Sequence, residues 1–529
     1  MIQLNFTQEQ ITKEEELQRA VNQILVRKIM SNHAQEKLTK CFDYYNGKEP
    51  IVIDSEKEDY EPKVFNLAKP IVDTATKTFV GVLPDITTDV DKDKDKITKF
   101  NQKLYARSFG NHIYQCAKNS SICGTSFLAL YNELGDTFPR FRELSPQYAD
   151  VVYDCSLARK KLFAFNIIED STYEDNQIKT CYICYVYTKE KIYAYKTGYF
   201  VFTNISETQL TKDLKIAPHF AFSYTDKATN TYVETSSIYH GYKDIPIVEL
   251  PNNNELKSDT ECVFDLIKLY NELQNNRAMN VQDIVHYVLL IKNARFGNEE
   301  ESSQAVDMLK KNRVLPLEGE NVDARFLSNP LNQTEIETLA KSIKYNIDLI
   351  SRVPDLSGVD FSQNASDPIL KIKTKPLLDL CCEKELAFTE PYLAILDIIL
   401  EWCKNNDKDY KNYYFNINEV ALKYAHPLPS NDLDMATQIA NLSNSGVLNP
   451  EVALQEMSWI PNVSQYIKGA TKWNESVDKR KELIKNNNEQ VANETNLERQ
   501  NEKPITNDRL DNSRNGALGE SNKISDNKV

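Results

Sequence analysis

The feature that most constrains the fold is a long apolar stripe between Asp259 and Val285. Apolar side chains recur there at the three-to-four-residue spacing that places them on one face of a helix, about seven turns long. Polar side chains occupy the opposite face of this helix: Asp265, Asn271, Gln274 and Asn275. A helix of this length and pattern needs an extended apolar partner.

A second helix of the same kind is predicted from about Gln333 to Arg352, and Asn332 with Glu335 forms a capping pair at its start. The apolar positions of this helix are Ile336, Leu339, Ala340, Ile343, Ile347 and Ile350. The segment between the two helices is short and mixed. It comprises a strand at Tyr287–Lys292, a helix at Ser302–Lys311 and a strand at Arg313–Pro316.

The chain before the first long helix has two different textures. An amphipathic helix is predicted within residues 1–40, and another at Lys69–Val80. From Gly124 to about Leu250, short aromatic and β-branched segments alternate with turn residues, which predicts an antiparallel β-rich region. Its strands are expected at Ser126–Tyr131, Leu162–Ile168, Thr180–Thr188, Lys191–Tyr195 and Tyr199–Thr203.

The chain after the second long helix begins with a polar loop, Pro354–Ser366. Asp367 and Pro368 then start a helix that runs to about Cys403. A strand at Tyr413–Leu422 and two short helices within Asp432–Met457, broken at Asn444–Asn449, follow. No aromatic residue follows Trp473, and residues 485–529 have too few apolar groups to offset their ordering entropy, so we expect disorder there. The fold class is therefore α+β.

Composition limits the partners and the compartment. No apolar run approaches the roughly 18 residues that span a bilayer, and the N-terminus lacks a secretory signal, so we expect no membrane association. A formal net charge of −14 argues against DNA as a tightly held ligand. The ten cysteines show no pairing pattern. Cys181 and Cys184 form one Cys-x-x-Cys within a predicted strand, where buried thiols are favoured over zinc.

Motifs for catalysis are missing, so we expect no enzyme and no cofactor or metal. A nucleotide-binding P-loop is absent, as are the zinc-protease, nucleophile-elbow and dinucleotide motifs. Asp91–Asp95 alternates acids with lysines like the start of a calcium loop, but Lys96 and Gln102 stand where glycine and glutamate are required. We interpret it as a solvated charged linker. The six histidines are dispersed, and each is interpreted as a surface or hydrogen-bonded core residue.

Four local stretches, in order along residues 40–460, resemble the portal proteins (head-to-tail connectors) of long-tailed bacteriophages. Tyr44–Gly47 is similar to a Y-Y-x-G motif near the N-terminus of that family, and Asn66–Gly81 to an N-x-x-K-x-I-V-D…aromatic-x-G segment. Ile245–Asn253 resembles the I-P-I-V-E-x-x-N-N sequence before the first stem helix. Ser351–Ser366 resembles the loop after the second stem helix, although Asp367-Pro368 follows where the family has glycine and a small residue.

The resemblance implies a portal-type ring subunit, usually one of twelve, with a β-rich wing, helical stem, small α/β clip and helical crown. The implied parts are the N-terminal and β-rich wing at 1–258, stem helix one at 259–285, the clip at 286–332, stem helix two at 333–352, the tunnel loop at 353–367, a long helix at 368–404, a return strand to the wing at 405–430, the crown at 431–475 and a disordered tail at 476–529.

The resemblance also implies a function. The ring would sit at one capsid vertex of the virion, conduct double-stranded DNA during packaging and ejection, and assemble in the host cytoplasm. Its partners would be the terminase large subunit, the major capsid and scaffolding proteins and the head-tail connector or adaptor proteins. The alternatives are another virion neck or minor capsid structural protein, or a metal-dependent nuclease.

Candidate site residues follow from the implied tunnel loop, which contains acids and no Lys or Arg. The residues expected to face the DNA channel are Asp355, Leu356, Ser357, Gly358, Val359, Asp360, Phe361, Ser362, Gln363 and Asn364. Lys371, Lys373 and Lys375 follow it and form either a weak basic ring or ordinary helix surface, of which the sequence favours surface. An acidic channel wall would repel phosphate and let DNA slide.

Overall fold

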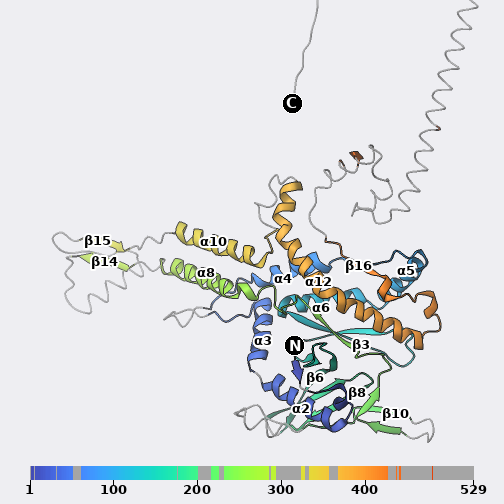
Figure 1. Ribbon diagram of the computed structural model, residues 1–529. Helices are drawn as coiled ribbons and strands as arrows, with labels where there is room; N and C mark the ends of the chain where they lie inside the picture. The colour runs from blue at the N-terminus through green and yellow to red at the C-terminus, as the bar shows by residue number, and fades with distance from the viewer. Residues whose placement is uncertain are drawn as a thin grey trace, which may run out of the picture. The chain divides into compact units, whose positions relative to one another are not determined.

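A computed structural model describes residues 2–4, 6–30, 32–51, 61–174, 177–199, 216–225, 232–284, 288–292, 323–327, 333–356 and 367–426, and single positions at 437, 440, 441 and 479. The chain divides into two compact units, Met1–Ser430 and Asn431–Val529. The account below concerns the first unit. The predicted crown helices and tail lie outside the described residues, apart from those single positions. The first unit combines helices and sheets, which confirms the α+β class (Figure 1).

The larger sheet has seven strands and forms the lower layer in Figure 1. Its strand order is β1 (Ile2–Leu4), β5 (Ala149–Asp154), β6 (Lys161–Glu174), β7 (Gln177–Tyr187), β8 (Lys191–Thr197) and β12 (Ser237–Tyr239), with β9 (Ile216–Pro218) also on β8. All pairs are antiparallel except β1 with β5. The predicted strands in β6, β7 and β8 are thus confirmed, whereas most of Tyr199–Thr203 lies outside the described residues.

Helix α2 (Glu14–Met30) packs its apolar face onto this sheet. Leu17, Ile24 and Leu25 are buried against Phe163, Phe165 and their neighbours, as the near-helical spacing predicts. Residues Gln8–Ile11 form a short helix, α1, that Thr7 and Gln10 cap reciprocally. A separate ribbon pairs β10 (Phe222–Thr225) with β11 (Tyr232–Thr235).

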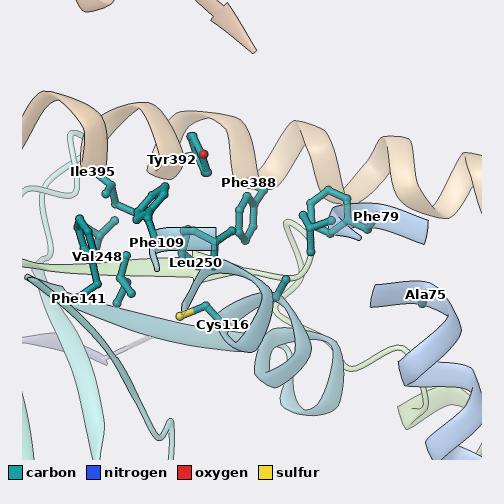
Figure 2. Packing of buried hydrophobic residues seen from close by; sticks show 14 of the residues in the cluster. Ala75, Phe79, Phe109, Cys116, Phe141, Val248, Leu250, Phe388, Tyr392 and Ile395 are labelled. Atoms are coloured by element: carbon teal, nitrogen blue, oxygen red, sulfur yellow. The ribbon is translucent and has the colours of Figure 1, made fainter. Parts of the chain in front are cut away.

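A second, smaller sheet lies at the centre of the main core. It comprises β13 (Ile247–Pro251), β3 (Thr125–Tyr131) and β4 (Arg140–Leu144), all antiparallel. The helices that pack around it are α3 (Asn32–Asn46), α4 (Ala68–Val80), α5 (Asp91–Ala106), α6 (Phe109–Cys123) and α12 (Asp367–Asn406). Figure 2 shows Phe109, Phe388 and Tyr392 meeting between α6 and α12. The predicted helices at Lys69–Val80 and after Asp367 are confirmed.

The acidic comb at Asp91–Asp95 is not a linker, which corrects the sequence interpretation. It forms the first turns of α5, whose Ile97, Phe100 and Leu104 are buried. Carboxylates are favourable at a helix N-terminus because they complement the helix dipole. Asp93 is also paired with Lys96 at 2.7 Å. The comb therefore starts a helix that buries the residues after it.

The predicted strand at Tyr413–Leu422 is wrong over most of its length. Only β16 (Ala421–Lys423) forms, on β2 (Asp85–Thr87). Two 3₁₀ turns, η2 (Tyr410–Asn412) and η3 (Ile417–Glu419), lie before it. The aromatic residues Tyr413 and Phe415 enter the core beside Phe100 instead of forming a ladder.

The two long predicted helices are confirmed as an antiparallel pair. The first is η1 (Glu261–Val263) continued by α8 (Phe264–Ile284), and the second is α10 (Gln333–Ser351) (Figure 1). Beyond them, β14 (Val288–Lys292) pairs with β15 (Asp323–Leu327). The strand at Tyr287–Lys292 is thus confirmed and β15 was not predicted. The expected Ser302–Lys311 helix, Arg313–Pro316 strand and Asn332 cap lie outside the described residues.

Two of the polar residues predicted opposite the apolar stripe of α8, Asn271 and Asn275, are buried, which the sequence pattern did not indicate. Asn275 accepts a hydrogen bond from the Lys63 amide and donates to the Lys63 carbonyl, both at 2.8 Å. Asn271 accepts from the Phe65 amide at 2.7 Å and donates to the Glu49 carboxylate. Asn side chains spaced one turn apart match alternate backbone groups of an extended segment, so α8 holds residues 61–66 through their main chain.

Most of the cysteines are buried. All ten thiols are free, and those of Cys155, Cys262 and Cys382 are exposed. Cys181 and Cys184 lie on β7, as predicted, and Cys184 belongs to the core beneath α2. Burial raises the pKa of the Cys41 thiol to about 11.

The carboxyl group of Glu49 gives a pH-dependent prediction. Glu49 is buried, one of its oxygens has no hydrogen-bond partner among the described residues, and burial raises its pKa to about 7. The ordinary pKa is about 4.3. The folded state therefore holds this proton more tightly, and the resulting stability is present at low pH and is lost as the pH rises from about 4.3 through 7. Glu49→Gln should raise Tm by about 2–4 °C at pH 8 and by less as the pH falls.

Differential scanning calorimetry from pH 5 to 8 measures this difference. Glu390→Gln on the exposed face of α12 is the matched control and should leave Tm unchanged at every pH. A Glu49→Gln variant that is equally or less stable than the parent at pH 8 would show that ionised Glu49 is well solvated.

Candidate functional site

The candidate site is the chain reversal between α10 and α12, where the resemblance places the tunnel loop. The structure describes its first residues, up to Leu356, and resumes at Asp367. Ser357, Gly358, Val359, Asp360, Phe361, Ser362, Gln363 and Asn364 lie outside the described residues. Their assignment to a channel therefore stays a prediction, and the geometry that follows concerns the base of the loop.

Helix α10 ends in a left-handed residue, Arg352, with φ of 62°. Glycine usually occupies this position, and another residue there costs about 1–2 kcal/mol in backbone energy. The Arg352 guanidinium donates two hydrogen bonds to Glu383 of α12, at 2.7 and 2.8 Å. Val353, the next residue, is buried in the main core. The direction in which the chain leaves α10 is thus fixed by the bidentate ion pair between Arg352 and Glu383 and by the burial of Val353.

Asp355 is tied back to α10. Lys344 donates to its carboxylate at 2.8 Å, and this bond raises the pKa of Lys344. Asp348 lies one turn along the same helix, where burial above all raises its pKa to about 6. These residues line a cavity of about 330 Å³, and Pro354 and Leu356 form part of its wall. Of the two aspartates predicted to face the channel, Asp355 is therefore already neutralised within its own chain.

A buried lysine anchors α12 beneath this loop. Lys384 donates to Asp259 at 2.6 Å and to the Asn252 amide oxygen at 2.5 Å. Asn252 donates to the other oxygen of Asp259 at 2.7 Å, and the Ser121 hydroxyl also donates to Asp259. The side chains of Lys384 and Asp259 are only 2% and 1% exposed. An ion pair this deep is stable only when further hydrogen bonds offset its loss of hydration, and Asn252 and Ser121 supply such bonds here.

We call this cluster of Ser121, Asn252, Asp259 and Lys384 the Lys384 joint, and it connects three segments that are distant in sequence. Ser121 lies in the last turn of α6, Asn252 and Asp259 lie between β13 and α8, and Lys384 lies in the middle of α12. Sequence reasoning missed it, although Lys384 falls on the same face as Leu377, Cys381 and Phe388, all buried. A single lysine on an apolar helix face was the available signal. Its partners could not be read from the sequence because they lie 125 or more residues away.

The residues of the first two portal-like motifs form a second cluster of hydrogen bonds. The Tyr45 hydroxyl donates to Asp73 at 2.9 Å, and Asn66 donates to the Tyr45 carbonyl at 2.9 Å. Gly47 has φ of 68°, and a side chain added there would meet the Asn66 amide at 3.1 Å. The Y-Y-x-G and N-x-x-K-x-I-V-D stretches are thus two halves of one contact between α3 and α4. Glycine is required because the turn is left-handed.

The lysines after the loop lie on the surface of α12. Lys371, Lys373 and Lys375 are exposed, and Lys375 contacts Asp379 at 3.6 Å. This exposure agrees with the favoured interpretation of helix surface, while a role as a basic ring around DNA stays untested. Three of the histidines, His112, His240 and His426, are hydrogen-bonded, as predicted.

Catalytic and membrane features can be assessed only where the structure describes the chain. Within those ranges no group of three or more His, Cys, Asp or Glu side chains is placed to hold a metal ion. No helix among the described residues is long and apolar enough to cross a membrane. The polar groups of the site are paired with one another and serve to position α10 and α12.

Comparison with known proteins gives two matches. The family described as "Phage portal protein, SPP1 Gp6-like" matches residues 28–495. A portal protein of Clostridium phage phiCD119 (strain Clostridium difficile/United States/Govind/2006) is 24% identical over 259 residues, which cover 46% of this chain and 54% of that relative. The matched region thus spans about half the length of the curated relative.

Replacing the buried Lys384 tests how much its ion pair with Asp259 contributes to the stability of the fold. Lys384→Met keeps the apolar part of the side chain but leaves Asp259 buried without its cation, which should lower the free energy of unfolding by about 3–5 kcal/mol. Lys375→Met on the same helix removes an exposed cation, 71% accessible, and should cost less than about 1 kcal/mol. Denaturant unfolding of both variants measures the difference. Equal effects would mean that the buried ion pair contributes no more than a surface one.

Proposed function

The chain belongs to the SPP1 Gp6-like family of phage portal proteins, and from this membership we propose that it forms a ring at one capsid vertex through which the genome is packaged and ejected. The match over residues 28–495 is the observation that carries the proposal. The ring is a virion component, and its assembly takes place in the host cytoplasm. Its role is structural, as a conduit and a docking site.

The arrangement of elements supports a division into the parts of a portal subunit. The sheets and the helices α2 to α6 form the wing, at 1–258, to which β16 within 405–430 returns by pairing with β2. Helices α8 and α10 form the stem, and the β14–β15 hairpin between them belongs to the clip at 286–332. The tunnel loop is 353–367, the long helix 368–404, the crown 431–475 and the tail 476–529.

The chemistry of the chain suits passive conduction of DNA. With a net charge of −14, a ring of such chains presents an acidic surface to phosphate, which favours sliding over adhesion. The sequence contains no P-loop, so the packaging energy must come from a separate ATPase. The partners on this proposal are the terminase large subunit, the major capsid and scaffolding proteins and the head-tail adaptor proteins.

The first test is the mass of the assembly. Light scattering after size exclusion should give about twelve times the 60.8 kDa of one chain, and negative-stain images should show a ring with a central channel. A particle of the same mass without a through-channel would favour the alternative, another neck or minor capsid component. A monomer at micromolar concentration with magnesium and salt present would contradict the ring.

The second test concerns the charge of the tunnel loop. Asp360→Lys should place one cation per subunit next to phosphate, so that DNA passage slows at low salt and recovers as salt rises. Asp355 is unsuitable because reversing its charge also breaks the bond with Lys344. Packaging of DNA in vitro at two salt concentrations provides the measurement. Asp95→Lys, the same charge change on the exposed side of α5, is the control. Equal behaviour of the two variants would place residue 360 outside the channel.

A further inference from the structure

Helix α10 has apolar side chains on two opposite faces. The inner face is buried and includes Ala340, Ile343 and Ile347. On the outer face, Tyr345 and Leu349 are 66% and 59% exposed. A helix that packs only against its own chain does not need this second face, and exposed large apolar groups in a cluster usually mark a contact surface.

The outer face of α10 has the spacing of a helix–helix seam. Thr338, Ser342, Tyr345 and Leu349 follow one another in steps of four, three and four residues, and all four are uncharged and exposed. That alternation is the pattern by which one helix fits side chains between those of another. We call these four residues the α10 outer seam.

Helix α8 has a matching seam, which is exposed except at the half-buried Glu272. Asp265, Leu269, Glu272 and Asn276 also follow in steps of four, three and four residues. Leu269 is 47% exposed at its middle, and Glu272 forms an ion pair with Lys268 of the same helix at 3.8 Å. We call these residues the α8 outer seam. Its face is distinct from that of Asn271 and Asn275, which hold residues 61–66.

The antiparallel register brings the two seams to the same levels along the stem. The pKa of Glu337 is lowered mainly by Lys341 on the same helix and, to a smaller extent, by Arg277 on α8. The pKa of Lys344 is raised mainly by its hydrogen bond with Asp355, and Tyr270 on α8 adds a smaller effect in the same direction. At the base of the pair, Glu261 and Cys262 line one cavity with Ile350, Ser351 and Arg352, so residue 262 is level with about 352. An antiparallel pair in this register also places residue 277 level with about 337 and residue 270 with about 344. By the same register 276, 272, 269 and 265 are level with 338, 342, 345 and 349.

We propose that the α10 outer seam packs against the α8 outer seam of the next copy of this chain. The inference rests on the proposed ring, because rotation about an axis along the stem leaves every residue at its own level. Tyr345 then covers Leu269 of the next copy, and Thr338 and Ser342 meet Asn276 and Glu272. Two different seams on one chain form a head-to-tail contact, which closes a ring instead of pairing two copies.

The charges beside the two outer seams support a second copy of this chain as the partner that packs on them. Lys341 is paired with Glu337 of its own helix at 2.9 Å, yet its side chain is 75% exposed beside Ser342, from where its charge approaches Glu272 of the next copy. Leu349 meets Asp265 at the junction end, where the carboxylate lies in the first turn of α8 and is stabilised by its free amide groups. One partner, the same chain, thus supplies the matching spacing, and its Lys341 supplies a charge opposite to that of Glu272.

Disulfide cross-linking tests this contact. The exposed Cys155, Cys262 and Cys382 are replaced by serine in the full chain, and Tyr345→Cys is combined with Leu269→Cys. Mild oxidation should join cysteines whose Cα atoms lie within about 7 Å. The monomer band on a non-reducing gel should be lost into a ladder that extends to the full ring. Leu339→Cys with Leu269→Cys is the matched control, because Leu339 is 51% exposed but lies off the seam.

The outcomes separate this inference from the proposed function. A ladder for the seam pair that is absent for the control pair and for each single cysteine supports the seam. A ring of full mass by light scattering, with no ladder or with equal ladders from both pairs, overturns the seam and leaves the ring standing. A monomeric parent chain overturns both.

Discussion

The buried ion pair between Lys384 and Asp259 is the contact on which the arrangement of the first unit depends. Two opposite charges removed from water lose hydration, which they regain only if each remaining donor and acceptor meets a partner at good geometry. Here Asn252 and Ser121 supply those partners. The requirement restricts how α6, β13, the start of α8 and α12 can approach one another, more strictly than apolar packing alone. The ion pair thus contributes to the uniqueness of the arrangement even if its net contribution to stability is small.

The Lys384 joint also links α8 to the end of α10. Asp259 lies just before α8, and Glu383, next to Lys384, accepts the two hydrogen bonds from Arg352 at the end of α10. The end of α10 and the start of α8 are therefore held to adjacent residues of a single helix. A tilt of α12 would displace α8 and α10 together. On the proposed function, α12 is therefore the element that couples the two stem helices to the start of the tunnel loop.

Much of the fold follows from local spacing, and the differences follow from long-range contacts. The stripes in α2, α8 and α10 and the short aromatic strands around β6 to β8 were predicted correctly because burial on one face imposes a period. The burial of Asn271 and Asn275 was not predicted because their partners, the main chain of residues 63 and 65, lie more than 200 residues away. Lys384 was missed for the same reason. In the candidate site, the bend at Arg352 and the pairing of Asp355 with Lys344 depend on side chains that no spacing rule connects.

The buried thiols have a consequence for the lifetime of the particle. A virion leaves a reducing cell and persists in air, where oxidation begins at thiolates that solvent can reach. Raised pKa values keep Cys41 and Cys381 protonated at neutral pH, and the core excludes oxidants from most of the others. Chemical ageing on the proposed function would start at Cys155, Cys262 and Cys382, which lie at the surface. Shelf life outside the host would then be governed by the tightness of packing, with no need for disulfide cross-links.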